Sequence, residues 1–179
     1  WNMNFVHGDI LDKDLIHKYC HDADVVHHLA GVTAVPRVLS EADNEKEKII
    51  EEVAIEGTQN ILDAINENCK IIMPSTHVVY ENIKEVKENI NEYEETCPIL
   101  SYAKSKDTNE KQLKKSGKNY VILRLGSVYG YTNDATRLDI MTNLFSKITS
   151  QDGTIKLFAG GRQIKSLVPL IDVARCFKF

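Results

Sequence analysis

The stretch Asp24-Val25-Val26-His27-His28-Leu29-Ala30-Gly31 decides the fold of this chain. Its apolar centre has the length of a buried strand, and it closes on small residues that permit a tight turn. A helical pattern follows over about 40–66, where apolar residues recur every three or four positions with charges between them. Because a strand that leads into a helix at this spacing is typical of a β-α-β unit, the stretch predicts a parallel sheet.

Strands and helices alternate along the rest of the chain as well. The predicted elements, in order, are a strand over 3–6, a helix through 19, a strand over 24–31, a helix over 40–66, a strand over 70–73 broken by Pro74, a helix over 102–115, a strand over 121–123, a helix over 137–150, strands near 155–158 and 166–171, and a last helix opened by Asp172. Asp12 and Ser101 are placed to cap two of the helices, and Gly117 to end one. The fold class is therefore α/β.

Composition excludes several classes of protein. The 179 residues carry a formal net charge of −4 and are 42% hydrophobic, which suits one domain or a little more and excludes disorder for most of the chain. The acidity argues against nucleic-acid binding, and no apolar run approaches the ~20 residues that span a bilayer. The four cysteines include no C-x-x-C pair. We therefore expect reduced thiols in a cytoplasmic protein, with no metal site.

Small or short polar residues follow four of the predicted strands. They are Gly8-Asp9, Ala30-Gly31, Ser75-Thr76 and Gly126-Ser127. Ligands of parallel α/β sheets bind beyond the carboxyl ends of the strands, so these pairs suit a cofactor that lies across the strand ends. Tight turns alone would explain any one pair equally well. Four pairs in succession favour the cleft.

Tyr102 and Lys106 form a Y-x-x-x-K pattern at the start of a predicted helix. Residues four apart lie on one face of a helix, so the Lys106 ammonium would favour the Tyr102 phenolate and lower its pKa from ~10 toward neutrality. A tyrosine in that state can exchange a proton with a substrate hydroxyl or carbonyl. Thr76, at an upstream strand end, offers a hydroxyl that can bond the same substrate oxygen. The pattern therefore predicts a catalytic site.

The pattern is weak when it stands alone, because Tyr80 and Lys84 match it too. Tyr80 enters the charged stretch 81–97, which predicts a solvated loop or mobile flap in which the geometry of a helix face is not assured. Its acidic part, residues 81–95, predicts a substrate lid or a plain exposed insertion equally well. An ordinary helix surface is the alternative for Tyr102 and Lys106.

Seven segments, in the same order and at the same spacing, resemble a known family. They are 8–12, 24–31, 56–62, 75–80, 102–106, 123–130 and 168–174. On these segments the chain, from about Val6 to Arg175, resembles the extended short-chain dehydrogenase/reductases, also called the NAD-dependent epimerase/dehydratase family. The resemblance implies a Rossmann-like parallel sheet with helices on both faces, here lacking the first β-α-β unit and its glycine-rich phosphate loop. We expect a piece of a longer protein: a partial NAD(P)-binding domain over 1–179, with a substrate region from about 131.

The resemblance implies a role for individual residues, and NAD or NADP as cofactor. Tyr102 resembles the catalytic acid/base, Lys106 the lysine that tunes it and binds the nicotinamide ribose, and Thr76 the catalytic hydroxyl. The other implied cofactor residues are Asp9 and Ile10 at the adenine, Leu29, Ala30 and Gly31 under the ribose and pyrophosphate, and Ser75, Leu125, Gly126 and Val128. The implied substrate residues are Thr76, His77, Ser127 and Lys165.

Departures from the family pattern bear on the activity. His77-Val78 stands where the sugar-nucleotide dehydratases carry Asp-Glu, and valine cannot transfer a proton. An epimerase of nucleotide sugars, or a reductase or dehydrogenase of a non-sugar carbonyl or alcohol, is therefore favoured over a dehydratase. Ala54, Glu81 and Ser127 replace the family's Asn, Gly and Asn, which leaves a non-catalytic NAD(P)-binding protein as a further alternative.

The resemblance also implies the partners of the protein. These are a small-molecule substrate, a nucleotide sugar by resemblance, and a second copy of the chain. The homodimer would pack through the helices over 41–66 and 102–116. No nucleic acid and no membrane is expected as a partner, because the charge and the length of the apolar runs suit neither.

Overall fold

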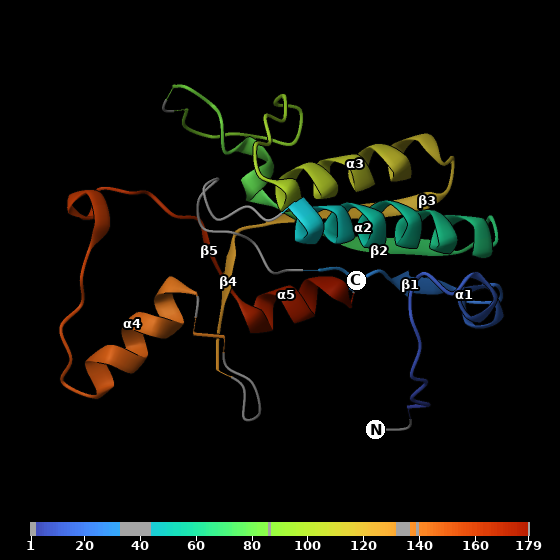
Figure 1. Cartoon of the computed structure of the whole chain (residues 1–179), viewed down its shortest axis with the longest axis horizontal. Coiled ribbons are helices and arrows are strands. Elements are labelled where there is room, and N and C mark those ends of the chain that lie inside the picture. Colours follow the sequence, from blue (N-terminus) through green and yellow to red (C-terminus); the bar gives the residue numbers. More distant parts are fainter. Residues whose placement is uncertain (1–2, 33–43, 86, 132–136, 139, 179) are drawn as a thin grey trace. The chain divides into compact units, whose positions relative to one another are not determined.

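The computed structural model describes residues 3–32, 44–85, 87–131, 137–138 and 140–178 (Figure 1). The chain divides into two compact units, Trp1–Arg124 and Leu125–Phe179. The predicted start of a substrate region near residue 131 stays a prediction. Among the residues that are described, no helix combines the length and the apolar character that crossing a membrane requires.

The first unit is built around a three-stranded sheet. Its elements are α1 (Lys13–Cys20), β1 (Val25–His27), α2 (Asn44–Ala64), β2 (Lys70–Thr76), the 3-10 helix η2 (His77–Tyr80), α3 (Ser101–Lys115) and β3 (Asn119–Leu125), whose last residue belongs to the second unit. The strand order is β1-β2-β3. β1 runs parallel to β2, with Val26 paired to Ile71. The predicted α/β fold with parallel strands is therefore confirmed.

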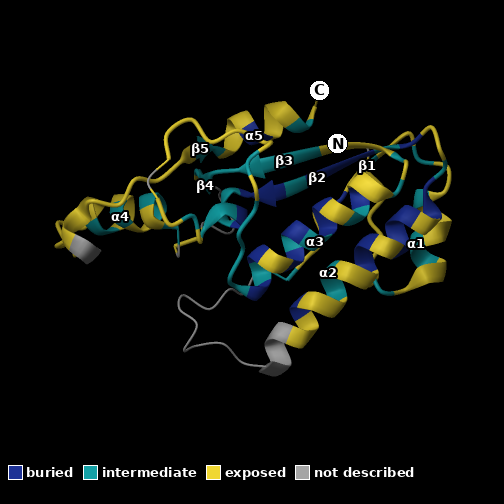
Figure 2. Cartoon of the chain, turned by 90° about the horizontal axis from the view of Figure 1, so that it is seen from above, coloured by how far each residue is buried: buried dark blue, intermediate teal, exposed yellow. Residues whose placement is uncertain are grey.

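The core of the first unit joins β2 to the two long helices. α2 and α3 pack side by side, and α3 also contacts β2 (Figure 2). The buried cluster consists of Ile61, Leu62, Ile65, Cys69, Ile71, Met73 and Leu113. All four cysteines are free thiols, and burial raises the pKa of the Cys69 thiol.

Strand β2 continues through Pro74, where the sequence predicted a break. Lys70 N donates to Asp24 O, and His28 N donates to Ile72 O, so the even-numbered residues of β2 face β1. Pro74 is also even-numbered and faces the same side. It lies beyond the His27–Ile72 pair, however, where β1 has ended. The amide proton that proline lacks would have no strand partner at that point, so proline costs the ladder no hydrogen bond.

The caps of the helices agree with the prediction in part. Asp12 caps α1, since its Oδ1 accepts from Leu15 N at 3.0 Å. Gly117 follows α3 with a φ of +71°, a conformation that favours glycine. The prediction for Ser101 is wrong: Leu100 is the N-cap of α3, without a side-chain hydrogen bond, and Ser101 is the first helical residue.

Two predicted strands are absent from the described residues. Residues 3–6 and 155–157 have no strand pairing, and η3 (Phe158–Gly161) begins where the second strand was expected to end. A run of apolar residues becomes a strand only where a neighbouring strand pairs with it, and the sequence pattern does not show the neighbour. The remaining elements of the second unit are β4 (Ser127–Tyr129), α4 (Met141–Ser150), β5 (Leu167–Pro169) and α5 (Leu170–Phe177), which begins two residues before Asp172.

The second unit is organised by a parallel pair of strands, β4 and β5. Ser127 N donates to Ser166 O at 2.8 Å, which brings the chain at Gly126 close to the chain at Ser166. A Cβ on Gly126 would lie 2.8 Å from the Ser166 carbonyl oxygen, so only glycine fits this approach. Gly126 thus has a packing role besides the cofactor role that the resemblance implies.

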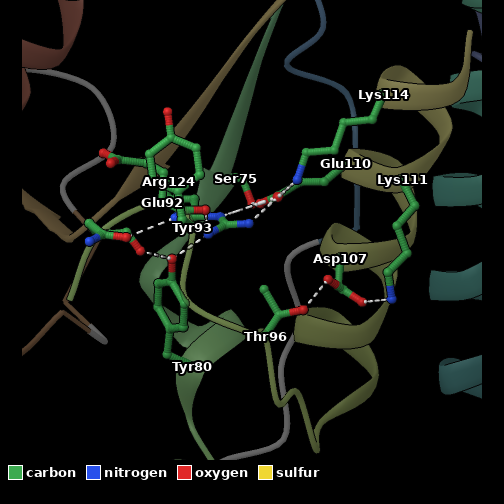
Figure 3. Close-up of polar contacts among 11 residues, drawn as sticks. Ser75, Tyr80, Glu92, Tyr93, Thr96, Asp107, Glu110, Lys111, Lys114 and Arg124 are labelled. Atoms are coloured by element: carbon green, nitrogen blue, oxygen red, sulfur yellow. Dashed lines mark hydrogen bonds and ion pairs between the residues drawn. The ribbon is translucent and has the colours of Figure 1, made fainter. Parts of the chain in front are cut away.

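A buried ion pair ties α3 to the sheet (Figure 3). The Glu110 side chain, 1% exposed, accepts from Arg124 of β3 at 2.6 Å and from the Ser75 hydroxyl of β2 at 2.6 Å. Lys114 lies 3.3 Å from the same carboxylate. Burial alone would raise the pKa of Glu110, but the hydrogen bonds from Arg124 and Ser75 outweigh it and hold the pKa below its usual range. One carboxylate therefore joins three elements.

We expect Glu110→Gln to lower the free energy of unfolding by about 3 kcal/mol, because it leaves the Arg124 charge buried without its partner. The measurement is urea denaturation at neutral pH. The exposed Glu56→Gln on α2 is the control and should stay within about 0.5 kcal/mol of the wild type.

The pH dependence of the same variant gives a second readout. A carboxylate with a lowered pKa stabilises the fold above its unfolded-state pKa, and this stability is lost as pH falls through the folded-state pKa. The wild type should therefore lose stability on acidification more steeply than Glu110→Gln. Equal stability of the two proteins at neutral pH would contradict the role given to the ion pair.

Candidate active site

Helix α3 carries the Y-x-x-x-K pair on the face that meets the sheet. Tyr102, Lys106 and Glu110 follow one another at four-residue steps, which places them on one side of the helix. The ion pair of Glu110 with Arg124 turns this side toward the strands. Tyr102 and Lys106 are both half-buried, whereas Lys104 on the opposite side is exposed. The predicted helical setting of the pair is therefore confirmed.

Lys106 lies near His28, the residue that follows β1. His28 is 3% exposed, and its Nε2 is 2.9 Å from Thr58 Oγ1 of α2. Burial first, and the nearby Lys106 ammonium second, lower the pKa of His28 to about 4. Burial also lowers the pKa of Lys106. The imidazole is thus neutral at pH 7, and the lysine approaches the carboxyl end of β1.

Sequence reasoning missed His28 and its partner Thr58. Both stand in segments that carry the resemblance, but no pattern assigned either of them a role. His28 immediately precedes Leu29, so its place between a strand and a predicted cofactor segment was the available signal. Its Nδ1 is buried and has no hydrogen-bond partner among the described residues. The imidazole therefore remains neutral because burial makes a proton costly.

Thr76 and Ser75 end β2 in different environments. Thr76 is 7% exposed, and its Oγ1 accepts from Val78 N at 3.2 Å, which caps η2. A hydroxyl that accepts a hydrogen bond keeps its own proton for donation. η2 packs against α3, so Thr76 opens an element next to the helix of Tyr102. The Ser75 hydroxyl donates to Glu110, and its predicted cofactor contact stays a prediction.

Tyr80 differs from Tyr102 as expected. It ends η2 rather than starting an α-helix, so the helix face that Y-x-x-x-K requires is absent there. Its hydroxyl donates to Asn91 O at 2.9 Å and accepts from Arg124, whose guanidinium also lies 5.1 Å from the tyrosine ring (Figure 3). Arg124 further donates to Glu92 O at 3.2 Å. These contacts hold the middle of the 81–97 loop against η2 and β3.

A pocket of about 310 Å³ opens beside the end of β1. It is lined by four predicted cofactor residues, Asp9, Ile10, Leu29 and Ala30, together with Val6, Gly8, Leu15, Ile16, Tyr19, Cys20, Val26, His27, His28 and Ile61. The Asp9 carboxylate accepts from Leu11 N at 2.9 Å, which fixes its orientation. Mainly apolar walls with one oriented carboxylate suit the adenosine part of a dinucleotide. A Cβ on Gly31 would meet nothing within 4 Å, so the chain there borders open space.

The other predicted residues lie outside this pocket. His77 begins η2 and is half-buried. Leu125, Gly126, Ser127 and Val128 lead from β3 into β4, and Lys165 is an exposed residue before β5; all five belong to the second unit. Their cofactor and substrate roles stay predictions.

Comparison with known proteins supports the relationship that these residues indicate. The sequence model of the family described as "NAD dependent epimerase/dehydratase family" matches residues 2–179. Over 103 residues the chain is 39% identical to the CDP-paratose 2-epimerase of Salmonella typhi. This match covers 54% of this chain and 28% of that protein.

Solved structures show the same fold. The UDP-glucuronic acid 4-epimerase of Bacillus cereus, in complex with UDP-glucuronic acid and NAD, is 27% identical, with a TM-score of 0.76 over 98% of this chain and 54% of that one. The UDP-glucose 4-epimerase of Thermotoga maritima, with UDP-glucose, is 22% identical, with a TM-score of 0.76 over 97% of this chain and 57% of that one. The predicted Rossmann-like fold is thus confirmed, and the chain spans about half the length of these structures. The chain belongs to the NAD dependent epimerase/dehydratase family.

Proposed function

We propose that the whole protein is an NAD-dependent epimerase of a nucleotide sugar, with Tyr102, Lys106 and Thr76 as its catalytic residues. The observation that carries this proposal is the place of Lys106, one helical turn from Tyr102 on the face of α3 that the Glu110–Arg124 ion pair turns toward the sheet. Lys106 also lies near His28, which lines the pocket that suits a dinucleotide. Relatives that act on CDP-paratose and UDP-glucuronic acid support a nucleotide sugar as the substrate.

In this proposal Tyr102 and Thr76 act on one oxygen of the sugar, and Lys106 acts on Tyr102. The Tyr102 phenolate accepts the proton of the sugar hydroxyl, while the Lys106 ammonium stabilises the phenolate. The Thr76 hydroxyl, whose oxygen already accepts from Val78 N, donates its proton in a hydrogen bond to the same oxygen. Asp9, Ile10, Leu29, Ala30 and Lys106 would hold NAD, which would supply the chemistry of hydride transfer.

The neutral state of His28 supports the cationic role of Lys106. A protonated imidazole at that place would put a second positive charge beside the ammonium and drive its pKa further down. Since the pKa of His28 lies at about 4, the ammonium meets no such repulsion at neutral pH. Half-burial of Lys106 also strengthens its attraction for a phenolate, because less water screens the two charges.

An epimerase is favoured over a dehydratase by the residues after Thr76. His77 and Val78 begin η2, and Val78 bonds through its backbone: its amide donates to Thr76 Oγ1, and its carbonyl accepts from Glu81 N. A dehydratase needs a further acid and base to eliminate water, and valine supplies neither. Net reduction or oxidation of a non-sugar carbonyl or alcohol remains the alternative, and it differs from epimerisation because it consumes the cofactor.

The homodimer belongs to the same proposal. α2 and α3 pack side by side, and α2 exposes Ile49 and Ile55 to solvent. Apolar residues on the surface of a helix pair support its use as an interface between two copies. Residues 41–43 of the predicted interface lie outside the described residues. The cytoplasmic location stays a prediction.

We expect Tyr102→Phe to lower the kcat of the whole protein by at least about a hundredfold, because the phenol that transfers the proton is lost. The assay is turnover of UDP-, CDP- and dTDP-sugars with NAD, with product sugars separated by chromatography. Tyr93→Phe, at a 97% exposed tyrosine, is the matched control and should keep the wild-type kcat. Equal turnover by Tyr102→Phe would refute the proposed role, and net NADH formation would indicate a dehydrogenase.

The pH profile tests Lys106 separately. Without the ammonium the phenolate is harder to form, so Lys106→Met should move the ascending limb of the kcat profile up by about one pH unit or more. Burial lowers the pKa of Lys106, so wild-type activity should fall again as rising pH neutralises it, and Lys106→Met should lack this fall. Lys104→Met, an exposed lysine on the same helix, is the control. Identical profiles for the wild type and Lys106→Met would show that the ammonium does not tune the base.

A further inference from the structure

We propose that Glu81 is a positioning residue that holds the Tyr102 end of α3 against η2, the element that Thr76 opens. The inference rests on the proposed function, in which Tyr102 and Thr76 act on one oxygen. Glu81 departs from the glycine that the family usually has at this place, and by the pattern alone this departure indicates an eroded site. Its contacts indicate instead that the side chain fixes the distance between two catalytic elements.

The start of α3 depends on Glu81 because the helix has no side-chain cap of its own. Leu100 is the N-cap, and its side chain makes no capping hydrogen bond. Glu81 Oε1 accepts from the backbone amide of Leu100 at 2.7 Å and from that of Ile99. Hydrogen bonds to a carboxylate are about twice as strong as those between neutral groups. One carboxylate therefore anchors the two residues before Ser101.

Glu81 is also tied to Thr76 through a single turn of chain. Glu81 N donates to Val78 O at 3.0 Å, which closes η2, and Thr76 caps the same turn by accepting from Val78 N. Glu81 thus connects the capped end of β2 with the residues that lead into α3. A glycine at position 81 would keep the backbone bond to Val78 but would lose both bonds to the start of the helix.

Two further contacts hold the same segments together. Because they do not involve the Glu81 side chain, a change of that side chain affects only the start of α3. Cys97 N donates to Val79 O at 2.8 Å, and Thr96 Oγ1 donates to Asp107 of α3 at 2.7 Å. These bonds keep the base of the 81–97 loop closed when the Glu81 side chain is changed. Loss of the carboxylate should therefore loosen residues 99–102 without unfolding the loop.

The consequence for the reaction is a matter of distance. Proton transfer needs the phenol within hydrogen-bond reach of the substrate oxygen, and a displacement of about 1 Å lowers rates by about a hundredfold. Substrate binding draws on other parts of the site, so it changes less. Loosening the start of α3 should thus lower kcat while KM stays close to its wild-type value.

The experiment compares Glu81→Ala with Glu81→Gln in the whole protein. Glutamine keeps an oxygen that can accept from both amides, whereas alanine does not. Hydrogen exchange of the Ile99 and Leu100 amides, followed by NMR, reports the contact without reference to activity. The exposed Glu88→Ala in the same loop is the control, and thermal unfolding shows which variants are folded.

We expect exchange of the two amides to accelerate by about tenfold or more in Glu81→Ala, and by much less in Glu81→Gln. kcat should fall by about tenfold or more in Glu81→Ala with KM changed less than about twofold, and Glu81→Gln should restore most of kcat. Unchanged exchange in folded Glu81→Ala would overturn the inference, as would wild-type kcat with accelerated exchange. An inactive wild type would refute the proposed function, while exchange would still decide whether Glu81 holds the helix.

Discussion

The Glu110 carboxylate bonds to Arg124 of β3 and to Ser75 of β2, so it fixes how α3 is turned about its own axis. A helix that packs only through apolar contacts can rotate by part of a turn at modest cost, because such contacts have little direction. A buried carboxylate with two short hydrogen bonds cannot, since each lost bond leaves a buried polar group without a partner. Tyr102 and Lys106 share the face of Glu110, so this constraint also sets where they point.

Local electrostatics follow from that orientation. Lys106 lies near the end of β1, where His28 is buried and carries no charge at neutral pH. Thr76 closes β2 and starts η2, and the Glu81 carboxylate reaches from the end of η2 to the start of α3. The site is thus assembled from three separate places along the chain by directional polar bonds, over a core of apolar residues that supplies the bulk of the stability.

Most features that depend on neighbours in sequence could be predicted, with the cap at Ser101 as the exception. The cap at Asp12, the positive φ at Gly117 and the shared face of Tyr102 and Lys106 all follow from spacings of a few residues. Features that depend on distant partners could not. The continuation of β2 through Pro74 depends on where β1 ends, and the apolar residues 3–6 form no strand because pairing needs a neighbour that no local pattern specifies.

The candidate site shows the same division. Its hydroxyl, phenol and ammonium could be found from residue types at strand ends and at helical spacing. The partners that fix them could not, because Glu110 meets Ser75 and Arg124, and His28 meets Thr58, across 14 to 35 positions of sequence. Glu81 is the clearest case, since its departure from the family pattern indicated loss of function while its contacts indicate support of the helix.

The titration of His28 tests the central claim most directly, namely that α3 turns Lys106 toward the end of β1. Imidazole resonances of labelled wild type and Lys106→Met would be followed by NMR from neutral pH to the acid limit of folding. The account predicts a midpoint near pH 4 in the wild type, and a higher one in Lys106→Met that stays below 6.5 because burial persists. The same midpoint in both proteins, or one near 6.5 in the wild type, would contradict it.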